Sequence, residues 1–316
     1  MDLFPLISIL SDGQFHSGSA LGKQLGVSRT AIWKALDGLS AYALEFESHK
    51  GKGYRLTEPL DLLDLNTIDQ ALRQMDDITV VTDVCVDSSN SELARRFPSY
   101  AGGLYVLLVE QQTQGRGRRG RRWTSPFAKN IYLSLGFDLQ GGPEVLQGLS
   151  IVIGVAVVNC LQSLGVSGLG LKWPNDVYMN GRKLAGILVE LEGEMAGTWR
   201  VTAGLGLNVN MVERDAIGLG QPWATIDEQI GVGRSELAGA LIVYISEHLS
   251  IFREAGFASF VSAFNQVDEL KDKEVDVLGP ELVGIAKGID AGGLMLLQTD
   301  AGMQRLNSGE VSVRVK

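Results

Sequence analysis

The chain has 316 residues, of which 45% are hydrophobic and 21% are charged, and its formal net charge is −9. That length allows two or three domains with at least one substantial core, and the composition is that of a globular protein. The negative charge argues against nonspecific binding of DNA or membranes by the whole surface, so any nucleic-acid contact needs a local basic patch.

Targeting signals and cysteine use favour a cytoplasmic location. Met1 is followed by Asp2 rather than by a basic segment, so we expect no signal peptide. Cys85 and Cys160 have neither CxxC nor metal-ligand spacing, which is typical of a reduced protein. The most apolar stretch, 149–158, is too short to span a membrane and predicts a buried helix. We therefore expect no membrane partner and no metal site built from a sequence motif.

Residues 1–60 predict a small separate module with a helix-turn-helix. One helix is expected to begin near Pro5, a second to cover 19–25, and a third to follow Ser28, which is a natural N-cap. The third helix carries apolar side chains on one face, at spacings of four and three: Ile32, Leu36 and Leu39. This order of elements is that of a DNA-binding helix-turn-helix.

Two short strands, 44–47 and 54–56, flank the turn Lys50-Gly51-Lys52-Gly53, as in the wing of a winged helix. Six bases balance six acids over 1–60, so the rest of the chain carries the whole negative charge. Two packed helices with a hairpin can also form a protein-interaction module, but the basic wing favours DNA. The residues expected to contact DNA lie on the third helix and the wing: Ser28, Arg29, Thr30, Trp33, Lys34, Lys50 and Lys52.

Residues 61–270 alternate strand-like and helix-like segments and predict a mixed α/β domain. Strands are expected at 104–110, 131–137, 177–179, 183–192 and 199–209. Helices are expected at 93–97, 144–164, 234–252 and 257–270. Asn180-Gly181 predicts a type I′ hairpin, and the Gly-rich segment 212–223 predicts a mobile surface loop.

Residues 271–316 predict a small all-β barrel, because short apolar strands are separated by glycine-rich turns. The expected strands are 274–278, 282–289, 294–299, 303–306 and 311–315. The chain is thus expected to be an α+β multidomain protein with domains 1–60, 61–270 and 271–316.

Residues 115–123 hold five arginines and three glycines and lie between two expected strands. Glycine lets a backbone turn tightly and approach a ligand, and arginine suits bidentate contact with carboxylate or phosphate. A solvated basic turn and an RGG-like RNA-binding segment are the alternatives. The position between two strands favours a loop that wraps an anion or a nucleotide.

A second motif, Lys172-Trp173-Pro174-Asn175-Asp176, predicts a rigid turn. If the Asn180-Gly181 hairpin forms, Lys183 lies close to Asp176, where a lysine point charge suits a phosphate or a developing negative charge. The alternatives are that Asn175 and Asp176 only cap the turn, and that Lys183 is a surface lysine at a strand end.

Two weaker motifs complete the set. Residues 87–91 read Asp-Ser-Ser-Asn-Ser before an expected helix, where they either cap that helix or present hydroxyls and an amide to a neutral heterocycle. Alternate glycines at 204 and 206 predict close approach of a ligand or another backbone to a strand.

The chain has no Ser-His-Asp or Cys-His arrangement, no paired carboxylates and no GxxxxGK[ST] motif. A P-loop NTPase is therefore excluded by motif, and hydrolysis through a covalent intermediate is poorly supported. A site made of positive charges and backbone amides suits a reaction limited by charge neutralisation and positioning, such as adenylation of a carboxylate.

Together these motifs resemble bacterial biotin protein ligases, in the class that carries a winged helix and also represses the biotin operon. The resemblance rests on 112–121, Trp123, 172–176, 183–190 and 204–210, and it covers the whole chain in order. It implies a winged helix-turn-helix, a mixed α/β core like that of class II aminoacyl-tRNA synthetases, and an SH3-like β-barrel. It also implies two half-reactions: biotin and MgATP give biotinyl-5′-AMP and pyrophosphate, and the adenylate then acylates a lysine.

The resemblance also assigns residues, position by position. Those expected to bind biotin are Ser88, Ser89, Asn90, Gln112, Arg116, Gly117, Arg118, Lys183, Gly186, Gly204 and Gly206. Those expected to bind ATP or the adenylate are Arg116, Arg118, Arg121, Trp123, Asn175, Lys183, Asn208 and Trp223. Those expected to be catalytic are Arg118, Asp176 and Lys183. The family's Ser-Thr-Asn triplet reads Ser-Ser-Asn here, and the loop around Trp223 matches the family poorly.

The partners that the resemblance implies are the biotin carboxyl carrier protein of acetyl-CoA carboxylase, operator DNA, and a second copy of the chain when the adenylate is bound. Mg²⁺ is expected to enter with ATP. The competing hypotheses are a lipoate-type acyl ligase, a small-molecule-sensing transcription regulator without ligase activity, and an RNA-binding protein. The winged helix, the arginine loop and the C-terminal barrel favour biotin over lipoate. The set Arg118, Asp176 and Lys183 argues against lost chemistry, and the net charge disfavours RNA.

Overall fold

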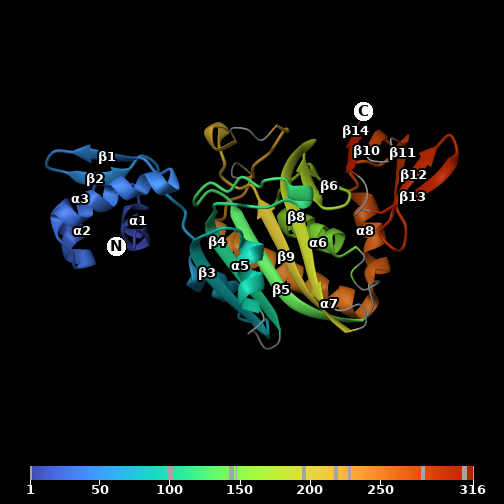
Figure 1. Cartoon of the computed structure of the whole chain (residues 1–316), viewed down its shortest axis with the longest axis horizontal. Helices are drawn as coiled ribbons and strands as arrows, with labels where there is room; N and C mark the ends of the chain where they lie inside the picture. The colour runs from blue at the N-terminus through green and yellow to red at the C-terminus, as the bar shows by residue number, and fades with distance from the viewer. Residues whose placement is uncertain are drawn as a thin grey trace.

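A computed structural model of the chain describes residues 2–97, 103–141, 146, 148–193, 197–216, 220–226, 229–278, 282–307 and 312–315. Figure 1 shows an N-terminal module at one end, a large mixed sheet in the middle and a small sheet at the other end. In the part of the chain so described, no helix combines the length and apolarity needed to cross a bilayer.

The N-terminal module is a helix-turn-helix followed by a two-stranded wing. Its elements are α1 (Phe4–Leu10), α2 (Gly18–Leu25), α3 (Arg29–Asp37), the 3-10 turn η1 (Gly38–Tyr42), β1 (Phe46–His49) and β2 (Gly53–Leu56). The Ser28 hydroxyl accepts a hydrogen bond from the Ala31 N–H at 3.1 Å, which confirms the predicted N-cap. Leu39 lies in η1 rather than on the third helix, but it is fully buried with Ile32 and Leu36.

The core of this module includes two residues from the central part of the chain. Phe127 and Ala128 belong to the same buried cluster as Leu36 and Leu56. The ring of Phe127 lies 4.9 Å from that of Tyr42, centroid to centroid. The N-terminal module is therefore packed onto the segment that directly follows the arginine loop.

The central part is a seven-stranded sheet in the order β3-β4-β5-β9-β8-β7-β6, in which only β3 and β4 pair in parallel. Its strands are β3 (Ile78–Val86), β4 (Leu104–Gln112), β5 (Ile131–Gly141), β6 (Leu169–Lys172), β7 (Asp176–Met179), β8 (Arg182–Gly193) and β9 (Gly197–Leu207). Its helices are α4 (Leu65–Ala71), α5 (Ser89–Arg96), α6 (Leu149–Ser163), α7 (Arg234–Ala255) and α8 (Val261–Gln266).

Helices α6 and α7 lie on the back of this sheet, whereas α5 packs on the front against β4, β5 and β9 (Figure 1). Helix α6 is apolar on all sides because it is buried between the sheet and α7. The helix predicted over 144–164 begins only at Leu149, after Gly148 with φ of 75°; residues 142–145 and 147 lie outside the described part. The helix predicted over 257–270 is shorter, since α8 ends at Gln266 after the 3-10 turn η6 (Phe257–Phe260).

The β7–β8 hairpin forms as predicted. Asn180 and Gly181 have φ of 50° and 74°, the left-handed conformations that a type I′ turn needs. In the resulting register Tyr178 faces Lys183, and Asp176 faces Gly186. The turn therefore returns Lys183 to the neighbourhood of Asp176.

The C-terminal part is a five-stranded antiparallel sheet in the order β13-β12-β11-β10-β14. Its strands are β10 (Glu274–Leu278), β11 (Leu282–Ile289), β12 (Met295–Thr299), β13 (Gly302–Leu306) and β14 (Ser312–Val315). Val311, the expected start of the last strand, lies outside the described residues. Val275, Ala286 and Leu297 share one buried cluster with the central sheet, so the two sheets form a continuous core.

Candidate functional site

The residues expected to bind ligands converge on the front of the central sheet, where β8 and β9 carry the glycines at positions 186, 204 and 206. Gly186 pairs with Gly206, and Leu188 pairs with Gly204. Successive side chains of a strand point to opposite faces, so these positions share one face. The alternate residues Ile187, Ala203 and Leu205 are buried in the core behind the sheet.

The glycines make room for side chains of the protein itself. A Cβ on Gly204 would lie 2.3 Å from Oδ1 of Asn90, and a Cβ on Gly206 would lie 2.4 Å from Cε2 of Trp123. A Cβ on Gly186 would lie 3.1 Å from Cζ3 of the same indole. The alternate glycines predicted close approach of a ligand or another backbone; the structure instead places the side chains of Asn90 and Trp123 against them.

A polar network lies at one end of this face, which we call the ring end (Ser88, Ser89, Asn90, Gln112, Ser134 and Glu190). The Ser89 N–H and hydroxyl both donate to Oε1 of Gln112, at 2.8 and 3.0 Å. The Gln112 amide donates in turn to the Ser125 hydroxyl at 2.9 Å. Ser88 and Ser89 are nearly inaccessible to solvent. The network fixes the orientation of the Gln112 side chain.

Asn90 forms hydrogen bonds to the protein through both N–H groups of its amide and through its oxygen. Its amide nitrogen donates to the Leu188 carbonyl at 3.1 Å and to Oε2 of Glu190 at 2.9 Å, and its Oδ1 accepts from the Ser134 hydroxyl at 2.7 Å. Helix α5 begins after Ser88, whose side chain makes no capping hydrogen bond. The helix-capping alternative for Ser88 and Asn90 is therefore wrong, because Asn90 points into the site.

The arginine loop is a tight hairpin-like excursion. The Trp123 N–H donates to the Gly115 carbonyl at 2.8 Å, Arg116 and Arg122 form an isolated antiparallel bridge, and the Gly117 N–H donates to the Arg121 carbonyl at 2.7 Å. A Cβ on Gly115 would lie 2.5 Å from the Trp123 carbonyl oxygen, so only glycine permits this closure.

The other end of the face, which we call the anion end, gathers Arg118, Asn175, Asp176 and Lys183. Nζ of Lys183 lies 2.8 Å from Oδ1 of Asp176 and 5.5 Å from the ring centroid of Trp123. Nη1 of Arg118 donates to Oδ1 of Asn175 at 3.0 Å. The structure thus brings together the three residues expected to be catalytic.

Asn175 holds Arg118 in place through the backbone of β8. The Asn175 amide donates to the Ile187 carbonyl at 2.8 Å, and the Ile187 N–H donates to the Asn175 carbonyl at 2.9 Å. Burial lowers the pKa of the Arg118 guanidinium, and the neighbouring charge of Arg119 lowers it further. Concentrated positive charge in a partly buried site is the setting in which an anion binds.

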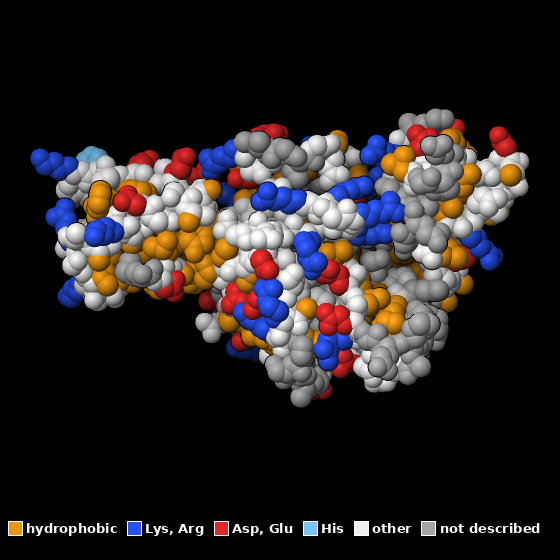
Figure 2. Space-filling model, in the orientation of Figure 1, with side chains coloured by type: hydrophobic (Ala, Val, Ile, Leu, Met, Phe, Trp, Pro, Cys, Tyr) orange, Lys and Arg blue, Asp and Glu red, His pale blue; other side chains and the backbone are white. Residues whose placement is uncertain are grey.

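Further cations border the anion end. The pKa of Lys172 is lowered, chiefly by burial. The carboxylate of Asp176 opposes this shift, and three neighbouring positive charges add to it: Lys183, Arg314 and Arg121. Figure 2 shows Lys and Arg side chains gathered on the central part of the molecule, beside the C-terminal module. Arg121 comes from the loop and Arg314 from β14, so separate parts of the chain contribute to one positive region.

Trp223 lies beside Lys183 through backbone contacts. Residues 183 and 223 form an isolated parallel bridge, in which the Ala224 N–H donates to the Lys183 carbonyl at 2.8 Å. The Asn208 amide donates to the Ala224 carbonyl at 3.1 Å. Asn208 therefore anchors the segment that carries Trp223 to the end of β9. Residues 217–219 of the expected loop lie outside the described part.

Two residues of the ring end were missed by sequence reasoning. Ser134 is fully buried in β5, and its hydroxyl lies 2.8 Å from that of Ser89. Glu190 accepts hydrogen bonds from both Asn90 and Arg116. A hydroxyl within the apolar run 131–137 was a usable signal for Ser134, since buried polar groups need partners. No local pattern indicates the contacts of Glu190.

The seven residues expected to contact DNA are all exposed on the N-terminal module. Trp33 is 56% exposed, which is high for a tryptophan on a packed helix. In the wing, Lys52 and Arg55 lie over the ring of Phe15, at 5.7 and 4.7 Å from its centroid. The module therefore presents a basic and aromatic face to solvent.

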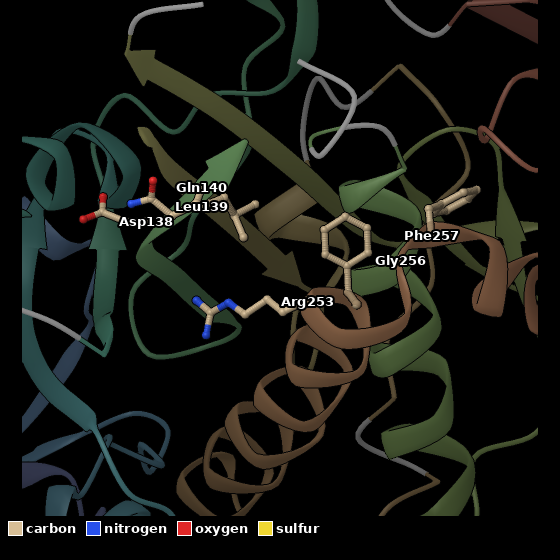
Figure 3. Close-up of a pocket in the computed structure, with 7 residues that line it drawn as sticks. Asp138, Leu139, Gln140, Arg253, Gly256 and Phe257 are labelled. Carbon is tan, nitrogen blue, oxygen red and sulfur yellow. The ribbon is translucent and has the colours of Figure 1, made fainter. Parts of the chain in front are cut away.

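A cavity of about 470 Å³ lies elsewhere, where the end of β5 meets the last turn of α7 (Figure 3). It is lined by Asp138, Leu139, Gln140, Phe252, Arg253, Gly256 and Phe257. None of these residues belongs to the ring end or to the anion end. The expected binding face is instead covered by Trp123, whose Nε1 is the one buried polar side-chain atom without a hydrogen-bond partner among the described residues.

Three family models match consecutive parts of the chain. Residues 3–55 match an HTH domain, 84–208 match the Biotin/lipoate A/B protein ligase family, and 272–314 match the Biotin protein ligase C terminal domain. The matches follow the same order as the N-terminal module, the central sheet and the C-terminal sheet.

Curated relatives and a solved structure point the same way. The chain is 40% identical to the "Bifunctional ligase/repressor BirA" of Salmonella typhimurium, over 98% of this chain and 96% of that protein. It is 34% identical to the "Biotin--[acetyl-CoA-carboxylase] ligase" of Paracoccus denitrificans, over 71% of this chain and 96% of that protein. A biotin protein ligase from Aquifex aeolicus in complex with biotin and ATP covers 75% of this chain and 99% of its own, with a TM-score of 0.62 and 28% identity.

Proposed function

The chain belongs to the biotin protein ligase family, in its bifunctional ligase/repressor branch, and from this premise we propose how its sites act. It activates biotin with ATP, transfers the biotinyl group to a protein, and represses transcription through its helix-turn-helix module. The observation that carries the ligase proposal is the pairing of a polar ring end with a cationic anion end on one glycine-lined face. That layout suits a molecule with a neutral heterocycle at one end and a carboxylate at the other.

In the first half-reaction, a carboxylate oxygen of biotin attacks the α-phosphorus of ATP, and the bond to the β-phosphate breaks. Pyrophosphate leaves, and biotinyl-5′-AMP remains. Carboxylate and triphosphate repel one another, so the reaction needs fixed positive charge where they meet. Lys183 and Arg118 supply that charge, and Asp176 and Asn175 hold them at 2.8 and 3.0 Å.

In the second half-reaction, the uncharged amine of an acceptor lysine attacks the acyl carbon. AMP leaves with the electron pair of the broken carbon–oxygen bond, and the nitrogen releases one proton as the amide forms. We propose the biotin carboxyl carrier protein of acetyl-CoA carboxylase as acceptor; the relative from Paracoccus denitrificans bears that carboxylase in its name. The arginine loop and Trp123 cover the mixed anhydride and keep water from it.

Mg²⁺ enters this scheme with ATP. Among the described residues no group of three or more His, Cys, Asp or Glu side chains could hold a metal ion. Mg²⁺ commonly binds substrate phosphates and only one or two carboxylates, so the single carboxylate of Asp176 fits a MgATP complex. Bound Mg²⁺ would supply neutralisation of phosphate charge, and Asp176 is the carboxylate that would hold it there.

The ligand contacts are assigned as the family resemblance implies. Biotin is held at the ring end by Ser88, Ser89 and Gln112, with Asn90 oriented by its neighbours. The adenylate phosphate is held by Arg118 and Lys183, and Trp223 stacks on adenine. The bridge between residues 183 and 223 supports this last contact, because it brings Trp223 next to the anion end.

For repression, the adenylate-bound chain forms a homodimer and binds a two-fold operator through α3 and the wing. The exposed side chains of Arg29, Trp33 and Lys34 support this proposal. Strand β3 forms one edge of the central sheet and has β4 as its neighbour there among the described strands, so it offers backbone groups to a second copy. Sedimentation with and without adenylate tests the dimer.

ATP–pyrophosphate exchange tests the ligase proposal. We expect exchange with biotin and none with lipoate or without an added acid. Exchange with lipoate alone would favour the lipoate-type ligase, and no exchange with either acid would favour a regulator without ligase activity. The proposal also includes domain boundaries after residues 60 and 270. It further includes a cytoplasmic location, which the free thiols of Cys85 and Cys160 suit.

A further inference from the structure

Glu190 lies where the ring end meets the arginine loop. Its Oε2 accepts a hydrogen bond from the Asn90 amide at 2.9 Å and one from the Arg116 guanidinium at 2.7 Å. One carboxylate oxygen thus joins helix α5, strand β8 and the loop. Positions 186, 188 and 190 share the front face of β8, so Glu190 belongs to the same surface as Gly186 and Leu188.

The contact with Asn90 decides how that amide is oriented. Because the Asn90 nitrogen donates to Glu190 and to the Leu188 carbonyl, its Oδ1 must face Ser134 and, through it, Ser89. Asn90 is only 3% exposed, so a rotated amide would leave buried polar groups unpaired, which is unfavourable. The Glu190 carboxylate and the Leu188 carbonyl can only accept hydrogen bonds, so together they admit one orientation of the amide.

The contact with Arg116 fixes the start of the arginine loop. Gly115 and Arg116 pair with Trp123 and Arg122 across the loop, so a fixed Arg116 also fixes the segment that leads to Trp123. Lys183 lies seven residues before Glu190 on β8, on the order of 20 Å along an extended strand. A guanidinium held by Glu190 is therefore at the opposite end of the face from the anion end.

We propose that Glu190 is a positioning residue of the ligase reaction, which orients Asn90 and anchors Arg116 over the ring end. Through this contact Arg116 holds the loop above the biotin ring. The phosphate is bound by Arg118 and Lys183 instead. This inference rests on the proposed biotin ligase function and adds two roles to it: one for a carboxylate with no assigned part, and one for the Arg116 side chain.

The test is a double-mutant cycle on the full chain, with Glu190→Gln, Arg116→Gln and both together. Kinetics of ATP–pyrophosphate exchange give kcat and the KM values for biotin and for ATP. The pair is partly exposed, so we expect each single variant to raise KM for biotin by about fivefold. KM for ATP and kcat should stay within about twofold. The double variant should raise KM for biotin by less than the product of the two single effects, since both changes remove the Glu190–Arg116 contact, whereas only Glu190→Gln also alters the contact with Asn90.

Glu192→Gln is the matched control, because Glu192 lies on the same strand and face but is exposed. It should leave all three constants unchanged. The inference is overturned if Glu190→Gln leaves KM for biotin unchanged, if the two single effects multiply in the double variant, or if Arg116→Gln mainly raises KM for ATP. Wild-type chain that gives no exchange would instead contradict the proposed function. Both side chains are partly exposed, so a folding defect in one variant leaves the other to decide.

Discussion

At the scale of single residues, the site is built by leaving side chains out. The front of β8 and β9 carries glycines where Asn90 and Trp123 come closest, and these two side chains take the space. The absence of a Cβ at the alternate glycines therefore makes room for side chains of the protein as well as for a ligand. Substitution at these positions should act through a displaced neighbour.

Gly206→Ala should displace the indole of Trp123, because the added Cβ would lie 2.4–2.7 Å from three of its atoms. An indole is rigid and cannot bend away, so we expect adenylate formation to fall by at least about tenfold, with a shift in tryptophan emission. Gly197→Ala on the same strand is the control, since its Cβ would meet nothing within 4 Å. Equal rates for the two variants would contradict the packing argument.

Asp268 is the residue from which we expect a pH effect on stability. Burial raises the pKa of its carboxyl to about 6, although the Leu270 N–H donates to it at 2.9 Å. The folded pKa lies above the unfolded one, so the stabilising contribution is complete below about pH 4 and is lost as the pH rises through about 6.

Asp268→Asn keeps the oxygen that accepts from Leu270 and removes the charge. It should raise the free energy of unfolding by about 1–2 kcal/mol at pH 7.5 and leave it unchanged near pH 4. Denaturant unfolding at several pH values measures the difference. Asp69→Asn, at an exposed position of α4, should show no such trend. Parallel curves for wild type and Asp268→Asn would refute the prediction.

At the scale of elements, the β7–β8 hairpin sets the anion end. Gly181 has φ of 74°, and a Cβ there would meet nothing within 4 Å, so an alanine would be strained only by its backbone. We expect Gly181→Ala to lower the free energy of unfolding by about 1 kcal/mol. Gly231→Ala has equal space and no positive φ, and it should change stability little. Gly181→Asn should recover part of the loss, because asparagine tolerates this conformation.

Elements with a local signal could be predicted from the sequence, and contacts between distant segments could not. Ser28 as an N-cap and the Asn180-Gly181 turn depend on neighbouring residues, and both are confirmed. The expected start of α6 at Glu144 lies outside the described residues, but Gly148, with its positive φ, begins the helix only at Leu149.

The site divides in the same way. The meeting of Lys183 with Asp176 follows from a hairpin and could be predicted. The meeting of Glu190 with Arg116 and Asn90 joins residues 74 and 100 positions apart, and only the folded sheet brings them together.

At the scale of the whole molecule, Glu58 attaches the end of the N-terminal module to two separate segments of the central part. Oε2 of Glu58 lies 3.0 Å from Nζ of Lys129, and its Oε1 lies 2.6 Å from a guanidinium nitrogen of Arg214. Lys129 follows the arginine loop, and Arg214 precedes Trp223 in the chain. The hydrogen bond from the Lys129 ammonium lowers the pKa of Glu58. Burial raises this pKa, and the hydrogen bond from Arg214 lowers it further.

Glu58→Gln should loosen this attachment without unfolding either part. Partly exposed ion pairs contribute at most about 1 kcal/mol, so we expect backbone amides of 57–64 to exchange up to about fivefold faster with deuterium. Glu47→Gln breaks an ion pair with Arg55 that lies wholly within the wing, and it should leave those amides unchanged. Identical exchange in both variants would show that Glu58 does not connect the two parts.

The packing of Phe127 and Ala128 into the N-terminal core has a consequence for the history of the family. In a ligase that lost the helix-turn-helix module, the side chains of Phe127 and Ala128 would be exposed to solvent, next to the loop that closes the site. Bare apolar surface invites aggregation, so selection should replace these two residues once the module is gone. Relatives without the helix-turn-helix module should therefore carry polar residues or proline there, and an ancestor reconstructed across the loss should show the change at the same branch.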